Sequence, residues 1–340
     1  MKFSTIVLFF MVCFWASCSE MEDEMSDTAP LILQQIVPPS HFPNITFPDI
    51  NAFTPERWYL GKKLFYDKRM SIDTTISCGS CHKQSFGFAD NVPTTSGAFN
   101  KPGVTNAPTL TNVAYQPYYT KEGGLPTLEM QVLVPIAEHN EFGFNIIEIE
   151  ARLKDDTMYQ NMAKKAYGRS LDPFTITRSI STFERSIVSG SSRYDEYTQG
   201  KATLTAEEKL GETLFFSAKT DCSSCHGGFN FTNYGFKNNG LYEVYVHPGR
   251  YRLTQKDSDL ALFKTPSLRN IGFTAPYMHD GSIATLAGVI DHYNSGGKPH
   301  IHKSDLVRPL NLTNSEKKAL VAFLLTLDDY TLLKNPYLSE

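Results

Sequence analysis

The chain has 340 residues, 41% of them hydrophobic, and its formal net charge at pH 7 is −4. Domains commonly run to roughly 100–200 residues, so this length and apolar content predict two of them. The sequence has no basic stripe for a phosphate backbone, which argues against nucleic acid as the main partner and leaves small molecules and proteins.

Residues 1–18 predict an export signal, because one lysine precedes an apolar run too short to span a membrane well, followed by small residues. Residues 15–18, WASC, resemble a bacterial lipobox, in which Cys18 is freed by cleavage and lipidated. An ordinary signal peptide with an incidental cysteine is the alternative. The acidic and proline-rich residues 19–48 are the expected flexible tether. We therefore expect a protein of the periplasm or cell envelope, held at a membrane by a lipid anchor.

The cysteines beyond the signal all lie in two copies of one motif, SCGSCHKQ from Ser77 and DCSSCHGG from Asp221. CxxCH is the attachment signature of c-type haem, in which both thiols bond to the porphyrin and the histidine is the proximal iron ligand. The sequence thus predicts two covalent haems, held by Cys78, Cys81, His82, Cys222, Cys225 and His226.

Two other readings of the cysteine pairs are weaker. A thioredoxin-like redox pair does not need the following histidine and usually lies in a βαβ pattern, which is absent here. A four-cysteine zinc site has its two pairs much closer than the roughly 140 residues that separate these.

The sequence also repeats around the two motifs. LGKKLFYD from Leu60 and LGETLFFS from Leu210 are each expected to end a short amphipathic helix. The first of these helices begins at the Thr-Pro-Glu of residues 54–56, and the second at a capping box from Thr205 to Glu208. Downstream, residues 107–124 align without a gap with residues 265–282, at a shift of 158 that continues through Thr127 and Thr285.

An apolar helix closes each half, and the second has a capping box from Thr313 to Glu316. The apolar positions are Ile176, Ile180, Phe183 and Ile187 in one helix and Leu320, Phe323, Leu324 and Leu327 in the other. Helix, CxxCH, loops and closing helix are the plan of a small cytochrome c domain. We predict a mainly α fold of two tandem cytochrome c-like domains with long haem-wrapping loops, at residues 49–200 and 201–335.

The repeat register predicts that the two irons differ. The shift of 158 places Pro135 of the first half opposite Tyr293 of the second. If this position faces the distal side, a phenolate caps the second iron, while the first stays open to peroxide or oxygen. Gln131 and Glu141 lie near Pro135, and a buried carboxylate there can move a proton between the oxygens of a bound peroxide. Solvated roles for both residues are the alternative.

Other side chains remain candidates for the ligand assigned to Tyr293. His292 is its immediate neighbour, and Met278 and His279 lie in the PYMHDG turn.

From about Ala52 to Leu327 the chain resembles the bacterial di-haem cytochrome c peroxidase family, and especially its MauG-like members. The resemblance is carried by CGSCH, NAPTLTN, the Gln131–Pro135–Glu141 constellation, CSSCH, LRNIGFTAPYMHDG and the closing helix. It implies that the N-terminal haem is the peroxide site and that the C-terminal haem receives or stores electrons. It also implies a calcium ion between the domains, held by the side chain of Asn106 and the backbone carbonyls of Thr274 and Pro276.

The chain departs from that family pattern in three places. The loop histidine that blocks the resting N-terminal haem in many members has no counterpart near Ala98, so we expect an open site without reductive activation. Tyr293 replaces the usual methionine ligand and should lower the potential of the C-terminal haem. Lys121 stands where the family has a tryptophan between the haems, with Tyr118 and Tyr119 as adjacent candidates for electron hopping.

These features predict an exported di-haem peroxidase that reduces hydrogen peroxide. Its electrons would come from a small redox protein, a cytochrome c or a cupredoxin, or from an organic or protein reductant. The alternatives are a MauG-like oxidase of a protein or organic substrate and a non-catalytic electron carrier or sensor, which needs both irons capped. Family members are often dimers, so a homodimer is also among the expectations.

Overall fold

The computed structural model describes residues 32–340, so the predicted signal peptide and Cys18 lie outside the described residues. The described chain is mainly helical, which confirms the predicted class, and its two short strands, β1 (Phe236–Lys237) and β2 (Phe263–Lys264), pair antiparallel with Phe236 opposite Lys264. None of the helices within residues 32–340 is both long and apolar enough to cross a membrane.

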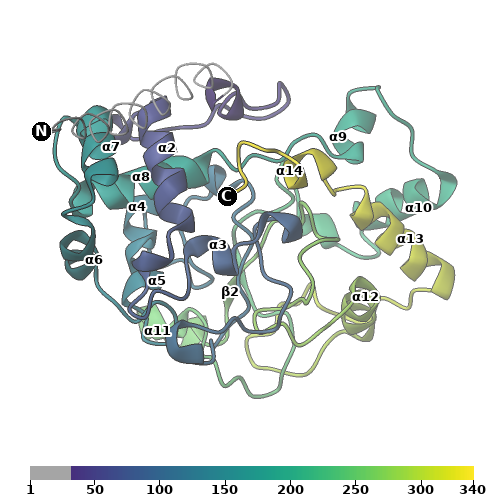
Figure 1. Cartoon of the computed structure of the whole chain (residues 1–340). Helices are drawn as coiled ribbons and strands as arrows, with labels where there is room; N and C mark the ends of the chain where they lie inside the picture. The colour runs from purple at the N-terminus through teal and green to yellow at the C-terminus, as the bar shows by residue number, and fades with distance from the viewer. Residues whose placement is uncertain (1–31) are drawn as a thin grey trace, which may run out of the picture.

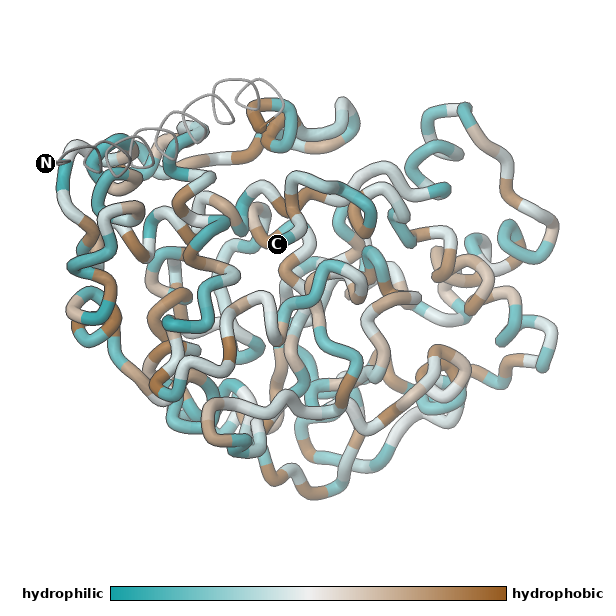
Figure 2. The backbone as a smooth tube through the Cα atoms, viewed as in Figure 1, coloured by the Kyte–Doolittle hydropathy of each residue, from teal (hydrophilic) through white to brown (hydrophobic). Residues whose placement is uncertain are grey.

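Most of the helices form two groups, seen at the left and right of Figure 1. The first group is α2 (Pro55–Tyr66), α4 (Leu128–Gln131), α5 (Leu133–Ala137), α6 (Ile146–Leu153), α7 (Thr157–Tyr167) and α8 (Pro173–Arg185). The second group is α9 (Arg193–Thr198), α10 (Ala206–Phe215), α12 (Leu286–Ser295) and α13 (Asn314–Leu325). The remaining short helices are α3 (Cys78–Cys81), α11 (Tyr251–Thr254) and α14 (Tyr330–Leu333). Hydrophobic residues recur along the helices of both groups (Figure 2).

The helix starts predicted from the sequence are confirmed. Thr54 caps α2, with Pro55 at its first position, and its hydroxyl accepts from the backbone N–H of Arg57 at 3.2 Å. Thr205 and Thr313 cap α10 and α13, each with a reciprocal bond to the glutamate three residues on. Such caps satisfy backbone donors that have no partner inside the helix.

Each half has its own apolar core. In the first, α2 packs against the closing helix α8, whose predicted apolar residues Ile176, Ile180 and Phe183 are all fully buried. In the second, α10 packs against α13 around Leu320, Phe323 and Leu324. Both closing helices predicted from the sequence are therefore confirmed, although Ile187 and Leu327 lie two residues beyond the helix ends.

The glycine of the repeated Leu-Gly phrase lets each helix pair cross closely. A Cβ on Gly61 would lie 1.9 Å from the carbonyl oxygen of Ser179 in α8, and a Cβ on Gly211 would lie 1.9 Å from that of Ala319 in α13. No side chain fits at either crossing unless the backbones separate.

Gly211→Ala is therefore expected to lower the free energy of unfolding by about 1–3 kcal/mol, the usual cost of overpacking, or by more because the clash is with backbone. Chemical denaturation of the holoprotein measures it. Gly288→Ala is the matched control, since the added methyl would meet only side-chain atoms of Ile283 and Thr285. Equal stability of the two variants would contradict the close-crossing explanation.

The shift of 158 found in the sequence holds in the structure. Tyr119 pairs with Leu125 in an antiparallel bridge, and Tyr277 pairs with Ile283 in the same way. Asn112 and Asn270 both have positive φ, and their backbone N–H groups donate to the carbonyls of Ile187 and Leu327, each two residues past the end of a closing helix. Thr127 and Thr285 cap α4 and α12. The predicted register is confirmed at these positions.

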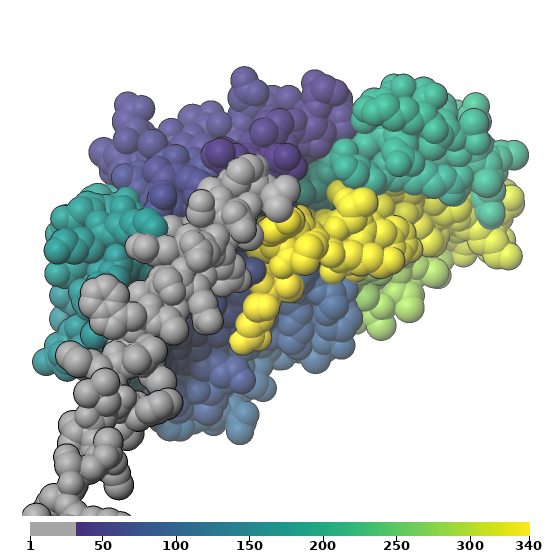
Figure 3. Space-filling view, turned by 45° about the horizontal axis from the view of Figure 1, so that its top comes forward, coloured from purple at the N-terminus to yellow at the C-terminus, as the bar shows by residue number. Residues whose placement is uncertain are grey.

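The two ends of the described chain pack against the body of the protein. Leu332 and Leu338 are buried in the first core, and Figure 3 shows the C-terminal residues (yellow) beside the N-terminal ones (purple). Within the predicted tether, Ile32 and Phe42 are also buried, and His41 Nε2 lies 2.9 Å from a carboxylate oxygen of Asp195. Ile32 and Phe42 thus attach this segment to the body, whereas Leu33 and Val37 are exposed, and a flexible tether over residues 19–48 stays a prediction.

Candidate functional site

The two CxxCH segments adopt the same tight turn. The backbone N–H of His82 donates to the carbonyl of Cys78 at 2.9 Å, and that of His226 donates to the carbonyl of Cys222 at 2.8 Å. None of these four cysteines forms a disulfide within the described residues. Burial raises the thiol pKa in each case, for Cys81 to about 12. Each turn thus holds two thiols and an imidazole in the order that haem attachment needs.

Both histidines are held in the tautomer that binds iron. His82 Nδ1 lies 3.1 Å from the carbonyl oxygen of Phe88, and His226 Nδ1 lies 3.2 Å from that of Phe231. A carbonyl only accepts, so Nδ1 carries the hydrogen and Nε2 keeps its lone pair. Burial lowers the pKa of both imidazoles, for His226 to about 4, and keeps them neutral. This pattern is typical of a metal-binding histidine with its second nitrogen fixed.

The two carbonyls come from strained backbone. Phe88 has φ of 57° and Phe231 has φ of 50°, and both side chains are buried. For a residue with a Cβ, the left-handed backbone conformation is less stable than the right-handed one by roughly 1–2 kcal/mol. It persists only where contacts with the surrounding structure stabilise it. The same left-handed conformation occurs beside both motifs. This repetition indicates that the conformation serves to direct each carbonyl at its histidine.

A cavity of about 390 Å³ lies at the second motif, and residues of the first half, among them Ala89 and Gln131, also line it. Cys222, Cys225, His226 and Tyr293 all line it. Its apolar walls include Phe215, Leu286, Ile290, Leu310, Leu320 and Leu324. The residues present at this motif therefore fit a c-type haem.

The cavity brings Tyr293 of α12 together with the His226 turn, as the sequence predicted. Burial raises the pKa of the Tyr293 phenol to about 12, so in the absence of a metal the phenol is neutral. His292 instead directs Nε2 to the carbonyl oxygen of Asn239 at 3.0 Å. Met278 and His279 also line the cavity, but the Met278 sulfur accepts from the Asn239 side chain and the His279 ring stacks on Phe263 at 4.2 Å. Tyr293 remains the predicted ligand.

The predicted acid lies beside the first motif. After burial, the charge of Glu141 has the largest effect on the Cys81 thiol, raising its pKa. Glu141 is an exposed residue, where the sequence predicted a buried carboxylate. Desolvation by the surrounding protein still raises the pKa of its carboxyl, the charge of Glu138 raises it further, and the charge of Lys121 lowers it. A carboxyl with a raised pKa suits proton transfer near neutral pH.

The chain around Glu141 is fixed by its backbone. The carbonyl of Pro135 in α5 accepts from the N–H of Phe142 at 3.1 Å, and the carbonyl of Glu141 accepts from the N–H of Ala98 at 2.8 Å. Gly97 packs so closely that a Cβ would lie 2.1 Å from the carbonyl oxygen of Asn140. The loop near Ala98 therefore supports the Glu141 turn with its backbone. Gln131, at the end of α4, lines the cavity that His226 and Tyr293 also line.

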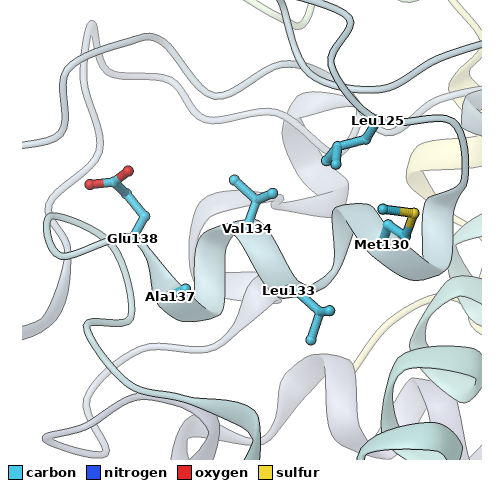
Figure 4. A pocket seen from close by; sticks show the side chains of 6 residues that line it. All are labelled: Leu125, Met130, Leu133, Val134, Ala137 and Glu138. Carbon is cyan, nitrogen blue, oxygen red and sulfur yellow. The ribbon is translucent and has the colours of Figure 1, made fainter. Parts of the chain in front are cut away.

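The outer side of α4 and α5 carries a separate apolar hollow of about 420 Å³ (Figure 4). It is lined by Leu125, Met130, Leu133, Val134, Ala137 and Glu138, and it shares no lining residue with the cavity at the second motif. The helix pair that carries Gln131 and Pro135 thus has a second, outward face.

Glu184 of α8 is a site residue that sequence reasoning missed. It is 4% exposed, and its Oε2 has no hydrogen-bond partner within the described part of the chain. Burial raises its pKa to about 8, against the opposing charge of Arg185. After burial, the charge of Glu184 has the largest effect on the Cys78 thiol, so this carboxyl lies near the first motif. In the sequence, its only sign is a charged residue next to Phe183 in a helix with an apolar face.

Glu184→Gln is expected to flatten the dependence of stability on pH. The raised pKa means that the folded protein keeps a proton that the unfolded chain releases, so this stabilisation is complete below pH 4.5 and is lost as pH rises to about 8. Removing it changes the slope of the unfolding free energy by up to about 1.4 kcal/mol per pH unit. Denaturation across this pH window measures the slope, with the exposed Glu148→Gln as control. Parallel curves for wild type and Glu184→Gln would contradict the assignment.

The residues expected to hold calcium, Asn106, Thr274 and Pro276, all line the cavity at the second motif. The calcium site stays a prediction. The ammonium of Lys121 is hydrogen-bonded to the backbone carbonyl of Asn106. Burial lowers the pKa of Lys121 to about 8, so it still carries its charge at neutral pH. Residues 32–340 contain no group of three or more histidine, cysteine or acidic side chains placed to hold a metal ion.

Two matching CxxCH turns, each with a neutral, half-buried histidine, in a mainly helical chain define the class of a c-type di-haem protein. Residues 55–203 match the sequence pattern of a family described as di-haem cytochrome c peroxidase. The methylamine utilization protein MauG of Methylorubrum extorquens is 32% identical over 289 residues, covering 84% of this chain and 81% of that protein. The chain therefore belongs to the di-haem cytochrome c peroxidase family, and it is MauG-like.

Other relatives agree. Cytochrome c551 peroxidase of Nitrosomonas europaea is 34% identical over 289 residues, covering 82% of each chain. A crystal structure of a MauG-like protein associated with microbial copper homeostasis is 36% identical, with a TM-score of 0.84, over 88% of this chain and 97% of that one. Family membership implies two c-type haems, which fit the two turns.

Proposed function

We propose that the protein is an exported di-haem peroxidase, built of two tandem cytochrome c-like domains, that reduces hydrogen peroxide at the N-terminal site. The observation that supports it is the asymmetry of the two sites. Tyr293 faces the cavity at His226, whereas the equivalent residue of the first half is Pro135, which has no ligand atom, and the acid Glu141 lies nearby.

When bound, the haem supplies the iron chemistry that cleaves the peroxide bond. Glu141 is the general base and then the general acid. Its carboxylate accepts the proton of one peroxide oxygen and then donates it to the other oxygen, which leaves as water. The Gln131 amide orients the peroxide by hydrogen bonding. At the second site, Tyr293 must lose its phenolic proton to bind as a phenolate, so ligand binding and proton release are coupled.

The partners belong to the same proposal. Electrons arrive from a small redox protein, a cytochrome c or a cupredoxin, or from an organic or protein reductant. We also propose that the protein is exported to the periplasm or cell envelope and that a lipid on Cys18 anchors it to a membrane. Assembly as a homodimer is part of the same proposal.

Steady-state kinetics of the purified holoprotein test the proposed reaction, with hydrogen peroxide and a panel of reduced cytochrome c, reduced cupredoxin and organic donors. We expect peroxide-dependent oxidation of at least one donor, at two electrons per peroxide. Protein that carries two haems per chain and consumes no peroxide with any donor would overturn it.

Oxidation of a protein or organic substrate, as a MauG-like enzyme, is the second candidate. The phenol at Tyr293 and the 36% identity to the MauG-like protein associated with microbial copper homeostasis favour it. Mass spectrometry of a candidate substrate after peroxide treatment distinguishes the two, because only this second activity leaves a permanent change of mass.

A further inference from the structure

The cavity at the second motif is close to several side chains whose chemistry suits a haem iron. Tyr293, Met278 and His279 line this cavity, and His292 is the neighbour of Tyr293 in α12. Phenolate, thioether and imidazole groups all serve as axial ligands of haem iron. If Tyr293 binds the iron, the surrounding residues must hold the alternative ligands in other contacts.

Asn239, which also lines the cavity, contacts two of these alternative ligands. Its Nδ2 donates to the Met278 sulfur at 3.2 Å, and its backbone carbonyl accepts from His292 Nε2 at 3.0 Å. A sulfur lone pair that accepts a hydrogen bond is not free to bind iron, and neither is an imidazole nitrogen that donates one. One residue thus engages both the thioether and one of the two imidazoles.

The same amide group contacts the predicted ligand. The Asn239 side chain is hydrogen-bonded to the Tyr293 phenol, and this bond lowers the pKa of the phenol against the larger effect of burial. A hydrogen bond that lowers a phenol pKa stabilises the phenolate, so the amide is the donor. Groups that hydrogen-bond a metal ligand orient it and tune the metal. The Tyr293 oxygen and the Met278 sulfur therefore share one NH2 group.

The orientation of this amide is fixed at its other end. Its Oδ1 accepts the backbone N–H of Leu241 at 3.2 Å, whereas the Tyr245 hydroxyl lies further away at 3.5 Å. A backbone N–H only donates, so the amide oxygen points to Leu241 and the NH2 group is left for the sulfur and the phenol. The backbone of this turn is held as well, because the carbonyl of Gly240 accepts the N–H of Lys298 at 2.6 Å.

We propose that Asn239 is a positioning residue that selects the axial ligand of the C-terminal haem, because its amide orients the Tyr293 phenol and keeps the Met278 sulfur engaged. The inference rests on the proposed role of Tyr293 as the ligand, and it adds the reason why the thioether beside this phenol does not bind instead. Without the NH2 group, the phenolate loses a stabilising bond and the sulfur becomes free. Both changes favour Met278.

Asn239→Leu tests the proposal, since leucine is close to asparagine in size but forms none of these side-chain bonds. We expect the absorption spectrum of the ferric holoprotein to gain the charge-transfer band of a methionine-ligated haem, for which Tyr293→Met supplies the reference. One of the two reduction potentials should rise with it. The band should be absent when Asn239→Leu is combined with Met278→Leu. An Asn239→Leu spectrum identical to that of the wild type would overturn the proposal.

Asn238→Leu is the matched control. Asn238 lines the same cavity, but its side chain is bonded to the His300 ring and the Gly240 backbone, neither of which lines the cavity. We expect a lower Tm and an unchanged ligand spectrum. Equal spectral changes in Asn238→Leu and Asn239→Leu would contradict the proposal, because general damage to the cavity wall would then explain both.

Asn239→Asp decides the question if Asn239→Leu does not fold. Its carboxylate still accepts the N–H of Leu241 but has no hydrogen to donate to the sulfur or the phenolate. The same methionine band is expected, and its absence would overturn the proposal.

Resonance Raman spectroscopy of the wild type separates this proposal from the one on which it rests, because an iron-bound phenolate is detected by its own ring vibrations. A wild-type protein without this signature would overturn the ligand role of Tyr293 and the selection by Asn239 together. A phenolate signature that persists unchanged in both Asn239 variants would overturn only the role of Asn239. None of these readouts depends on peroxide turnover.

Discussion

Glu141→Gln is expected to leave both haems attached but to slow the reaction with hydrogen peroxide by roughly 10²–10⁴-fold, the usual range for general acid–base catalysis. Glutamine keeps the size and polarity of the side chain but cannot accept and return a proton. Rapid mixing of the ferric holoprotein with peroxide, followed by absorption spectroscopy, measures the rate. Because the carboxylate is the active base, the wild-type rate should fall as pH drops through the raised pKa of Glu141, and this limb of the profile should be absent from the variant.

Glu138→Gln is the matched control for this variant. Glu138 follows α5 three residues before Glu141, and the charge of its side chain raises the pKa of Glu141. Its backbone carbonyl, which accepts the N–H of Glu141 at 3.0 Å, is kept in the variant. Loss of the side-chain charge should shift the acid limb to lower pH and change the maximal rate little. An unchanged peroxide rate in Glu141→Gln, with both haems in place, would remove Glu141 from the mechanism.

Tyr293→Met is expected to raise the reduction potential of the C-terminal haem by on the order of 0.1 V or more, within the span of about 0.8 V that axial ligands set. An anionic phenolate stabilises ferric iron, whereas a thioether favours the ferrous state. Spectroelectrochemical titration of both haems measures the shift, and only one of the two potentials should move.

Tyr245→Phe is a suitable control for the ligand variant. Tyr245 also acts on the Tyr293 phenol through its charge, and its hydroxyl contacts Asn238 and Asn239, but it does not line the cavity. Its loss should leave both potentials close to those of the wild type. Two unchanged potentials in Tyr293→Met would show that another atom binds this iron.

Much of the architecture could be predicted from local sequence signals. The CxxCH spacing, the caps at Thr54, Thr205 and Thr313, and the ungapped shift of 158 each act over a few residues, so the sequence carries them directly. The tight helix crossings were signalled only by the repeated glycine, whose reason lies in the carbonyls of Ser179 and Ala319 on helices distant in sequence.

The site features that the sequence did not reveal depend on tertiary contacts. Phe88 and Phe231 have no local preference for positive φ, and only their contact with a histidine explains it. The unpaired Oε2 of Glu184 becomes evident only when α8 is seen to bury it. Lys121 was recognised as a departure from the family pattern, but its bonds to the backbone carbonyls of Asn106 and His279 required the fold.

The most direct test of two unlike haems is the electron paramagnetic resonance spectrum of the resting ferric holoprotein. If Tyr293 caps one iron and nothing in the chain caps the other, the spectrum contains one low-spin and one high-spin signal of equal weight. Two low-spin signals would mean that a side chain closes the N-terminal iron as well, and the proposed peroxide site would be lost.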